Sequence, residues 1–129
     1  MRFYIRIPNY LLLTAFVLLV GVSRSLNPPS PEELYANPET TEEFLSRGTL
    51  YLKRRDYEKA LADFIQAEKL DPQNSSVYLK QGSTLSALNR PAEAIEQYEK
   101  SKALSEYGGA LIQLSIDRER EKLQTQQGE

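Results

Sequence analysis

The strongest constraint on the fold of this chain is an internal repeat with a period of 34 residues. At this offset Gly48 aligns with Gly82 and Ala60 with Ala94, so small residues match small ones. Large residues match large ones in the pairs Phe44 and Tyr78, Phe64 and Tyr98, and Leu70 and Leu104. The apolar spacing within each unit is helical. The sequence therefore predicts an all-α fold of repeated helices, with no strand.

Turn and capping residues mark the ends of the expected helices. Asp71 precedes Pro72 and so avoids the α region, which ends one helix, and Asn74 or Ser75 can cap the next. Pro91 fits the first position of a later helix. The predicted helices cover residues 41–53, 57–70, 75–88, 91–105 and 109–124.

The small residues of the repeat have a packing role, because antiparallel helices approach closely where side chains are small. The predicted points of close approach are Gly48, Ala60, Gly82 and Ala94. Larger side chains then fill the space beside them. The expected fillers are Tyr51, Phe64 and Leu70.

This pattern resembles the tetratricopeptide repeat, a helix-turn-helix unit of 34 residues. The resemblance covers two units, residues 41–74 and 75–108, and implies an α-solenoid of antiparallel helix pairs. The chain departs from the family pattern at Arg47 and Gln81, where leucine is usual. It departs again at Glu106, where proline would close the second unit.

The fifth predicted helix, residues 109–124, begins like a third unit. Ile112 falls at the fourth position of that unit, but Ile116 stands where glycine or alanine is expected, and the polar run DRERE follows. We therefore expect a solvated C-terminal capping helix, which repeat arrays need. The polar residues after Gln124 are expected to fray.

The resemblance implies a groove for a protein partner, lined by the first helix of each pair. Its contact positions in this sequence are Glu42, Leu45, Thr49, Leu52, Ser76, Leu79, Ser83 and Ser86. Leucines and small hydroxyls suit an extended or helical peptide with apolar anchors. Chaperone-binding members of the family hold a C-terminal carboxylate with lysine and asparagine at the positions of Leu45 and Thr49, so that mode of binding is disfavoured.

Residues 1–25 have the layout of a signal peptide or a membrane anchor. Arg2 and Arg6 precede an uncharged run from Tyr10 to Val22. As a helix this run spans about 20 Å, short of a hydrocarbon core of about 30 Å, which favours a cleaved signal. No Ala-x-Ala motif follows, which leaves a retained anchor open, and a buried core helix is the third alternative. In the first two cases the leading positive charge predicts a repeat domain outside the cytoplasm, either membrane-anchored or secreted.

Residues 26–40 form a proline-rich spacer. Ser30, Pro31 and Glu33 together offer a cap, a first helical residue and a capping-box partner, so a short helix through Tyr35 is expected. Pro38 ends any such helix.

The composition excludes several classes of chemistry. The chain contains no Cys and no His, which removes disulfides, thiolate and imidazole nucleophiles and the usual zinc ligands. We expect no cofactor, no metal site and no enzymatic activity. The net charge of −2 disfavours nucleic acid as a partner.

The sequence therefore predicts a protein-interaction adaptor or assembly factor that binds a partner peptide or helix in the groove. The alternative is a homo-oligomer that associates through Ile112 and Ile116, taken as exposed on the capping helix. Two units are fewer than an isolated array usually needs, which leaves a homodimer open as a way to complete the core.

Overall fold

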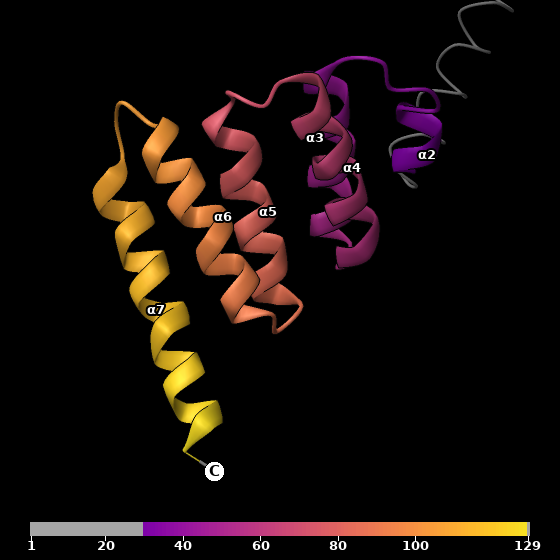
Figure 1. Ribbon diagram of the computed structural model, residues 1–129. Coiled ribbons are helices and arrows are strands. Elements are labelled where there is room, and N and C mark those ends of the chain that lie inside the picture. Colours follow the sequence, from indigo (N-terminus) through magenta and orange to yellow (C-terminus); the bar gives the residue numbers. More distant parts are fainter. Residues whose placement is uncertain (1–29, 129) are drawn as a thin grey trace, which may run out of the picture. The chain divides into compact units, whose positions relative to one another are not determined.

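The computed structural model describes residues 30–128, and the secondary structure of this part consists of helices without strands (Figure 1). The predicted all-α fold is confirmed. The helices are α2 (Pro31–Leu34), α3 (Thr41–Lys53), α4 (Tyr57–Leu70), α5 (Ser75–Ala87), α6 (Pro91–Leu104) and α7 (Gly109–Gln127). Helices α5 and α6 end one residue before the predicted ends, and α7 continues through residues that were expected to fray.

The chain divides into two units, residues 1–34 and residues 35–129. In the first unit, α2 begins with a capping box, as predicted. The backbone N–H of Glu33 donates to Ser30 Oγ at 3.1 Å, and the N–H of Ser30 donates to Glu33 Oε2 at 3.0 Å. The predicted signal peptide or anchor lies outside the described residues. None of the helices between residues 30 and 128 has both the length and the apolar character needed to cross a membrane.

In the second unit each helix packs against the next one along the chain, from α3 through α7 (Figure 1). The two turns inside the helix pairs have the same geometry. Arg55 and Asn89, which are one repeat apart, both adopt positive φ, at 65° and 56°. Equivalent turns of this kind give both pairs the same antiparallel arrangement.

Side-chain caps start the first helix of each pair. At α3 the carboxylate of Glu43 accepts hydrogen bonds from the backbone N–H groups of Glu39 (2.9 Å) and Thr40 (3.1 Å). These bonds favour the ionised carboxylate and lower the pKa of Glu43. At α5 the side chain of Asn74 accepts from Ser76 N at 3.1 Å. The caps satisfy backbone donors that helix ends leave without partners.

Each helix pair is closed by an aromatic ring that packs on a glycine. A β-carbon on Gly48 would lie 2.5 Å from Phe64 Cε1, and one on Gly82 would lie 2.7 Å from the ring of Tyr98. Gly48, Phe64, Gly82 and Tyr98 are all buried, as are the predicted contact residues Ala60 and Ala94. In each helix pair the aromatic ring therefore lies directly against the backbone of the glycine, and we refer to this as the ring-on-glycine contact.

One predicted filler does not lie in the core. Tyr51 and Phe64 are buried with Ala60, but Leu70 is 52% exposed. Leu70 is the last residue of α4, where the chain leaves the helix pair for the turn to α5. The prediction for Leu70 is wrong for this reason.

An ion pair lies between the helices of the first pair. The guanidinium of Arg47 donates two hydrogen bonds to the carboxylate of Asp63, at 2.7 and 2.8 Å, and a third to the carbonyl of Tyr35 at 3.0 Å. Asp63 is buried. Arg47, which departs from the family pattern, thus fixes residue 35 against the first repeat.

The corresponding residues of the second pair are Gln81 and Gln97, and they do not bond to each other. Gln81 Nε2 instead donates to the carbonyl of Phe64 (3.2 Å) and to Glu68 Oε2 (2.8 Å), both on α4. Gln97 Oε1 is buried without a hydrogen-bond partner among the described residues. Arg47 therefore pairs with Asp63 of its own repeat, whereas its counterpart Gln81 bonds to the preceding repeat.

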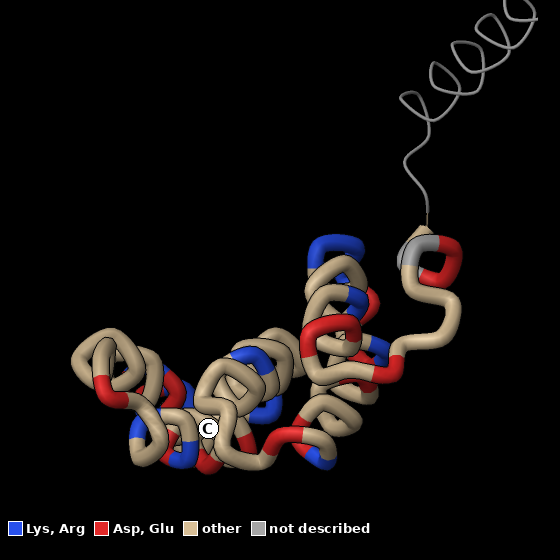
Figure 2. Tube along the Cα trace, turned by 90° about the horizontal axis from the view of Figure 1, so that it is seen from above, with Lys and Arg blue, Asp and Glu red and all other residues tan. Residues whose placement is uncertain are grey.

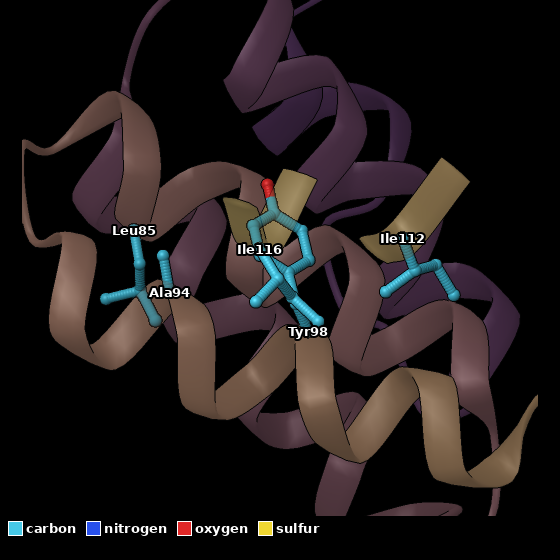
Figure 3. Close-up of a cluster of buried hydrophobic side chains, with 5 residues drawn as sticks. All are labelled: Leu85, Ala94, Tyr98, Ile112 and Ile116. Atoms are coloured by element: carbon cyan, nitrogen blue, oxygen red, sulfur yellow. The ribbon is translucent and has the colours of Figure 1, made fainter. Parts of the chain in front are cut away.

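Helix α7 is an integral part of the core. Figure 3 shows Ile112 and Ile116 packed with Tyr98, Leu85 and Ala94 in one buried cluster. The prediction that both isoleucines are exposed and available for self-association is wrong, because α6 covers them.

The polar run of α7 is also not fully solvated. Glu119 is only 2% exposed. Its carboxylate accepts hydrogen bonds from Ser86 Oγ at 2.6 Å and from Lys122 Nζ at 2.8 and 3.1 Å. A buried carboxylate with a cation and a hydroxyl as partners is tolerated, which explains how an acidic residue occupies a packing position.

Candidate partner-binding groove

The predicted groove positions of α3 lie partly against the core. Glu42 is exposed, whereas Leu45, Thr49 and Leu52 are half-buried, and the two leucines pack against the cluster around Tyr51. The hydroxyl of Thr49 donates to the carbonyl of Leu45 at 2.6 Å. The α3 part of the groove therefore presents two half-buried leucines, a threonine hydroxyl that is already bonded, and the exposed carboxylate of Glu42.

The predicted positions of α5 are more accessible. Ser76, Leu79 and Ser83 are exposed. Ser83 Oγ donates to the carbonyl of Leu79 at 2.9 Å. Ser86 is half-buried, and its hydroxyl bonds to Glu119 and Lys122 of α7. Ser86 thus joins α5 to α7.

Burial shows which face of α7 meets the preceding helix. In α7 the buried stripe is Ile112, Ile116 and Glu119. In α5 two stripes are buried, and Gln81 of the stripe Val77, Gln81 and Thr84 bonds to the preceding helix. The stripe of α7 follows this one by 35 residues, and it follows the other, Tyr78, Gly82 and Leu85, by the repeat period of 34.

The helix starts keep the repeat period, since α5 begins at residue 75 and α7 at residue 109, each after a connection of four residues. The two connections differ in conformation, because Gly108 has a φ of 88° where its counterpart Asn74 has −82°. On α7 the residues Leu111, Leu114, Arg118 and Glu121 share one face at helical spacing. All four are exposed, and they were not predicted as groove residues from the sequence. The available signal was Leu114, an apolar residue 35 positions after Leu79.

A pocket of about 320 Å³ lies between α5, the end of α6 and the start of α7. Its apolar wall includes Leu79, Leu111 and Ile112, and Tyr107 stands in the loop beside it. The remaining lining residues are small, and they are Ser75, Ser76, Ser101, Ser105, Gly108 and Ser115. The pocket thus opens on the predicted groove at Ser76 and Leu79.

Three of the five serine hydroxyls of the pocket donate to backbone carbonyls. Ser101 donates to the carbonyl of Ser75 at 2.9 Å, Ser115 donates to Leu111 at 3.3 Å, and Ser105 donates to Tyr107. Their oxygens remain as acceptors. The lining includes no charged side chain, so the pocket favours apolar groups and hydrogen-bond donors.

Four of the six large apolar side chains that are exposed in the described part gather around this pocket or on the α7 row beside it. They are Leu79 (38% exposed), Tyr107 (86%), Leu111 (73%) and Leu114 (61%). Single exposed apolar residues are ordinary, but a group of them marks an interaction site.

The buried tyrosines of the first helices have packing roles. The hydroxyl of Tyr78 donates to the carbonyl of Pro72 at 2.8 Å. Burial, assisted by the nearby Glu68 carboxylate, raises the pKa of the Tyr78 phenol. Tyr78 therefore stays protonated and holds the turn that precedes α5. Within residues 30–128 no cluster of three acidic side chains has the arrangement of a metal site.

Comparison with known proteins agrees with this architecture. Two tetratricopeptide repeat family models match residues 42–74 and 75–107. Tetratricopeptide repeat protein 28 from Mus musculus and from Homo sapiens is 34% identical over 67 residues, which is 52% of this chain and 3% of each relative. Stress-induced-phosphoprotein 1 from Caenorhabditis elegans is 32% identical over 62 residues, which is 48% of this chain and 19% of that protein. The chain therefore spans a small part of these relatives. The two matched repeats, with the ring-on-glycine contact in each pair, show that the chain belongs to the tetratricopeptide repeat family.

Proposed function

We propose that this chain is a protein-interaction adaptor or assembly factor that binds a segment of a partner protein in its groove. Tetratricopeptide repeats are generally protein-interaction modules. The observation that carries the proposal is the group of exposed apolar side chains around the pocket between α5 and α7. Their burial by a partner removes apolar surface from water, which is favourable.

A catalytic role has little support. Repeats of this family are typically non-catalytic, and the sequence has neither His nor Cys. Nucleic acid is also a poor candidate, since Figure 2 shows acidic and basic residues interspersed along the helices and not gathered in a basic stripe. A protein is the class of partner that these properties favour.

The proposal includes export or membrane tethering of the adaptor. Its support is the sequence of residues 1–25, with arginines ahead of an uncharged run. A tethered adaptor presents its groove at a membrane surface, whereas a secreted adaptor is released from the membrane. Intact mass of the native protein distinguishes the two, because a cleaved signal lowers the mass by the residues that are removed.

The test of partner binding is an affinity capture with the full-length chain, tagged at its C-terminus, from the membranes and secreted fraction of its own cells. The groove variant is Leu79→Asp, and the matched control is Leu70→Asp, which changes an exposed leucine on α4. We expect a partner that the wild type and the control retain and that Leu79→Asp loses, while all three give the same helical circular dichroism. A partner retained equally by all three places binding away from the groove and contradicts the proposal.

Light scattering of the same samples gives their molar mass and so tests the alternative function, a homo-oligomer. If the exposed leucines join two copies of the chain, the wild type is dimeric and Leu79→Asp is monomeric. A monomeric wild type with a groove-dependent partner supports the adaptor.

A further inference from the structure

We propose that the anchoring site of the groove is the pocket between α5 and α7, and that it takes a bulky apolar side chain of a partner segment that carries an acidic residue close by. This inference rests on the proposed adaptor function and adds to it the location of the anchor and the chemistry of the bound segment.

The two sides of α7 differ in chemistry. On one side Gln113 donates a hydrogen bond to Asp117, and Arg120 donates one to Glu99. The groove side instead exposes Leu111 and Leu114. A helix that served only as a solvating cap would gain nothing from two exposed leucines. Their burial by a partner would remove apolar surface from water, which favours binding.

The size and polarity of the pocket indicate what kind of group it can bind. A volume of about 320 Å³ is at the small end of the range for ligand sites, and it suits one or two side chains better than a large molecule. The hydroxyl oxygens of Ser101, Ser105 and Ser115 can accept hydrogen bonds, while their protons are already donated to backbone carbonyls. A tryptophan N–H or a backbone N–H of the bound segment meets this requirement, while its apolar body contacts Leu79 and Leu111.

A positive charge on α7 indicates that the bound segment is acidic. Arg118 is exposed and lies one helical turn beyond Leu114, on the face of α7 that carries Leu111. No hydrogen bond or ion pair engages its side chain within residues 30–128. The neighbouring cations are occupied, since Arg120 pairs with Glu99 and Lys122 pairs with Glu119. Arg118 is thus the cation of α7 that is left for a carboxylate of the partner, and arginine binds carboxylates through two parallel hydrogen bonds.

The experiment uses a phage-displayed library of random 12-residue peptides, selected on the immobilised full-length chain. We expect the selected peptides to share an aromatic residue or leucine with Asp or Glu within one helical turn of it. A synthetic peptide of the consensus sequence is then titrated against the wild type and the variants by fluorescence anisotropy.

Two variants test the two halves of the site. Leu111→Asp is expected to weaken peptide binding by about tenfold or more, because it places a charge in the apolar wall. Arg118→Glu is expected to weaken binding of the acidic peptide by several-fold and to spare a peptide whose acidic residue is replaced by its amide. The matched controls are Leu70→Asp and Lys69→Glu, both on exposed sites of α4, and they should bind like the wild type. Leu111→Ala repeats the test without a new charge.

The outcomes separate the inference from the adaptor function. Peptide binding that is lost with Leu79→Asp but unchanged with Leu111→Asp and Arg118→Glu overturns the inference and leaves the groove in place. Peptides that show no apolar and acidic pairing also overturn it. Binding that is indifferent to all groove variants overturns both proposals.

Discussion

The ring of Phe64 occupies the space into which a side chain at position 48 would project. A β-carbon on Gly48 would lie 2.5 Å from Phe64 Cε1, and Phe64 itself has no exposed surface. Tyr98 has the same relationship to Gly82, at 2.7 Å. Neither ring can retreat without disturbing the helix pair that it closes.

Substitution of either glycine should therefore destabilise the fold. We expect Gly48→Ala and Gly82→Ala each to lower the free energy of unfolding by about 1 to 3 kcal/mol, because the core is overpacked. The control is Gly109→Ala at the start of α7, whose β-carbon would lie 4.0 Å from Lys102 Cγ. Urea denaturation measures the three values. Equal effects at all three positions would contradict the ring-on-glycine contact.

The ion pair between Arg47 and Asp63 should show coupling. Asp63→Ala leaves a half-buried arginine without its carboxylate, and we expect a loss of about 2 to 3 kcal/mol. Replacing both residues by glutamine, as in the second repeat, should cost less than the sum of the single replacements by about 1 to 2 kcal/mol. This double-mutant cycle cancels the separate bond from Arg47 to Tyr35, since every Arg47 variant loses it. Additive losses would show that the pair contributes no mutual stabilisation.

Replacement of Gln97 should stabilise the fold, in contrast to the substitutions above. Its Oε1 is buried without a partner among the described residues, and an unsatisfied buried acceptor costs about 1 to 3 kcal/mol. Gln97→Met keeps much of the shape and removes this acceptor, so we expect the melting temperature to rise. Gln124→Met, at an exposed position of α7, is the control and should change little. A lower melting temperature for Gln97→Met would show that the amide has a bonding role.

Glu43 makes stability depend on pH. Hydrogen bonds from Glu39 and Thr40 lower its pKa in the folded chain below the ordinary value of 4.5. The stability from the ionised carboxylate is therefore fully present above about 4.5 and is lost as the pH falls through the folded pKa. We expect Glu43→Gln to melt with a smaller loss of stability on acidification than the wild type. An NMR titration of the Glu43 carboxyl group that gives a pKa at or above 4.5 would contradict the capping-box explanation.

The four helices of the two repeats could be predicted from the sequence because their determinants are local and repeat at a fixed period. Gly48 and Phe64 recur as Gly82 and Tyr98, and Pro72 and Pro91 mark the turns. Leu70 was misplaced because helical spacing alone does not show that a helix end projects beyond its partner.

The α7 half of the site could not be predicted for a different reason. The connection after Leu104 has four residues, as does the one after Leu70, but Gly108 has a φ of 88° where its counterpart Asn74 has −82°. This conformation affects which face of α7 meets α6, and it cannot be inferred from a period of two units. A helix turned by one residue rotates by about 100°, enough to exchange a buried face for an exposed one. Ile112 and Ile116 were therefore expected outside, and Leu111 and Leu114 were not recognised as groove positions. The burial of Glu119 was missed because one of its partners, Ser86, lies on α5, which is distant in the sequence.

Asp117 lies on the exposed side of α7, whereas Gly48 and Gly82 of the earlier first helices are buried beneath an aromatic ring. Where the glycines admit an aromatic ring, Asp117 presents a carboxylate that is bonded to Gln113 and paired with Arg120. A further helix, from this chain or from another copy, would have to strip water from these groups and would find no hollow for its ring. These groups disfavour end-to-end stacking of copies through α7, and a variant designed to polymerise there would first need a small, neutral residue at position 117.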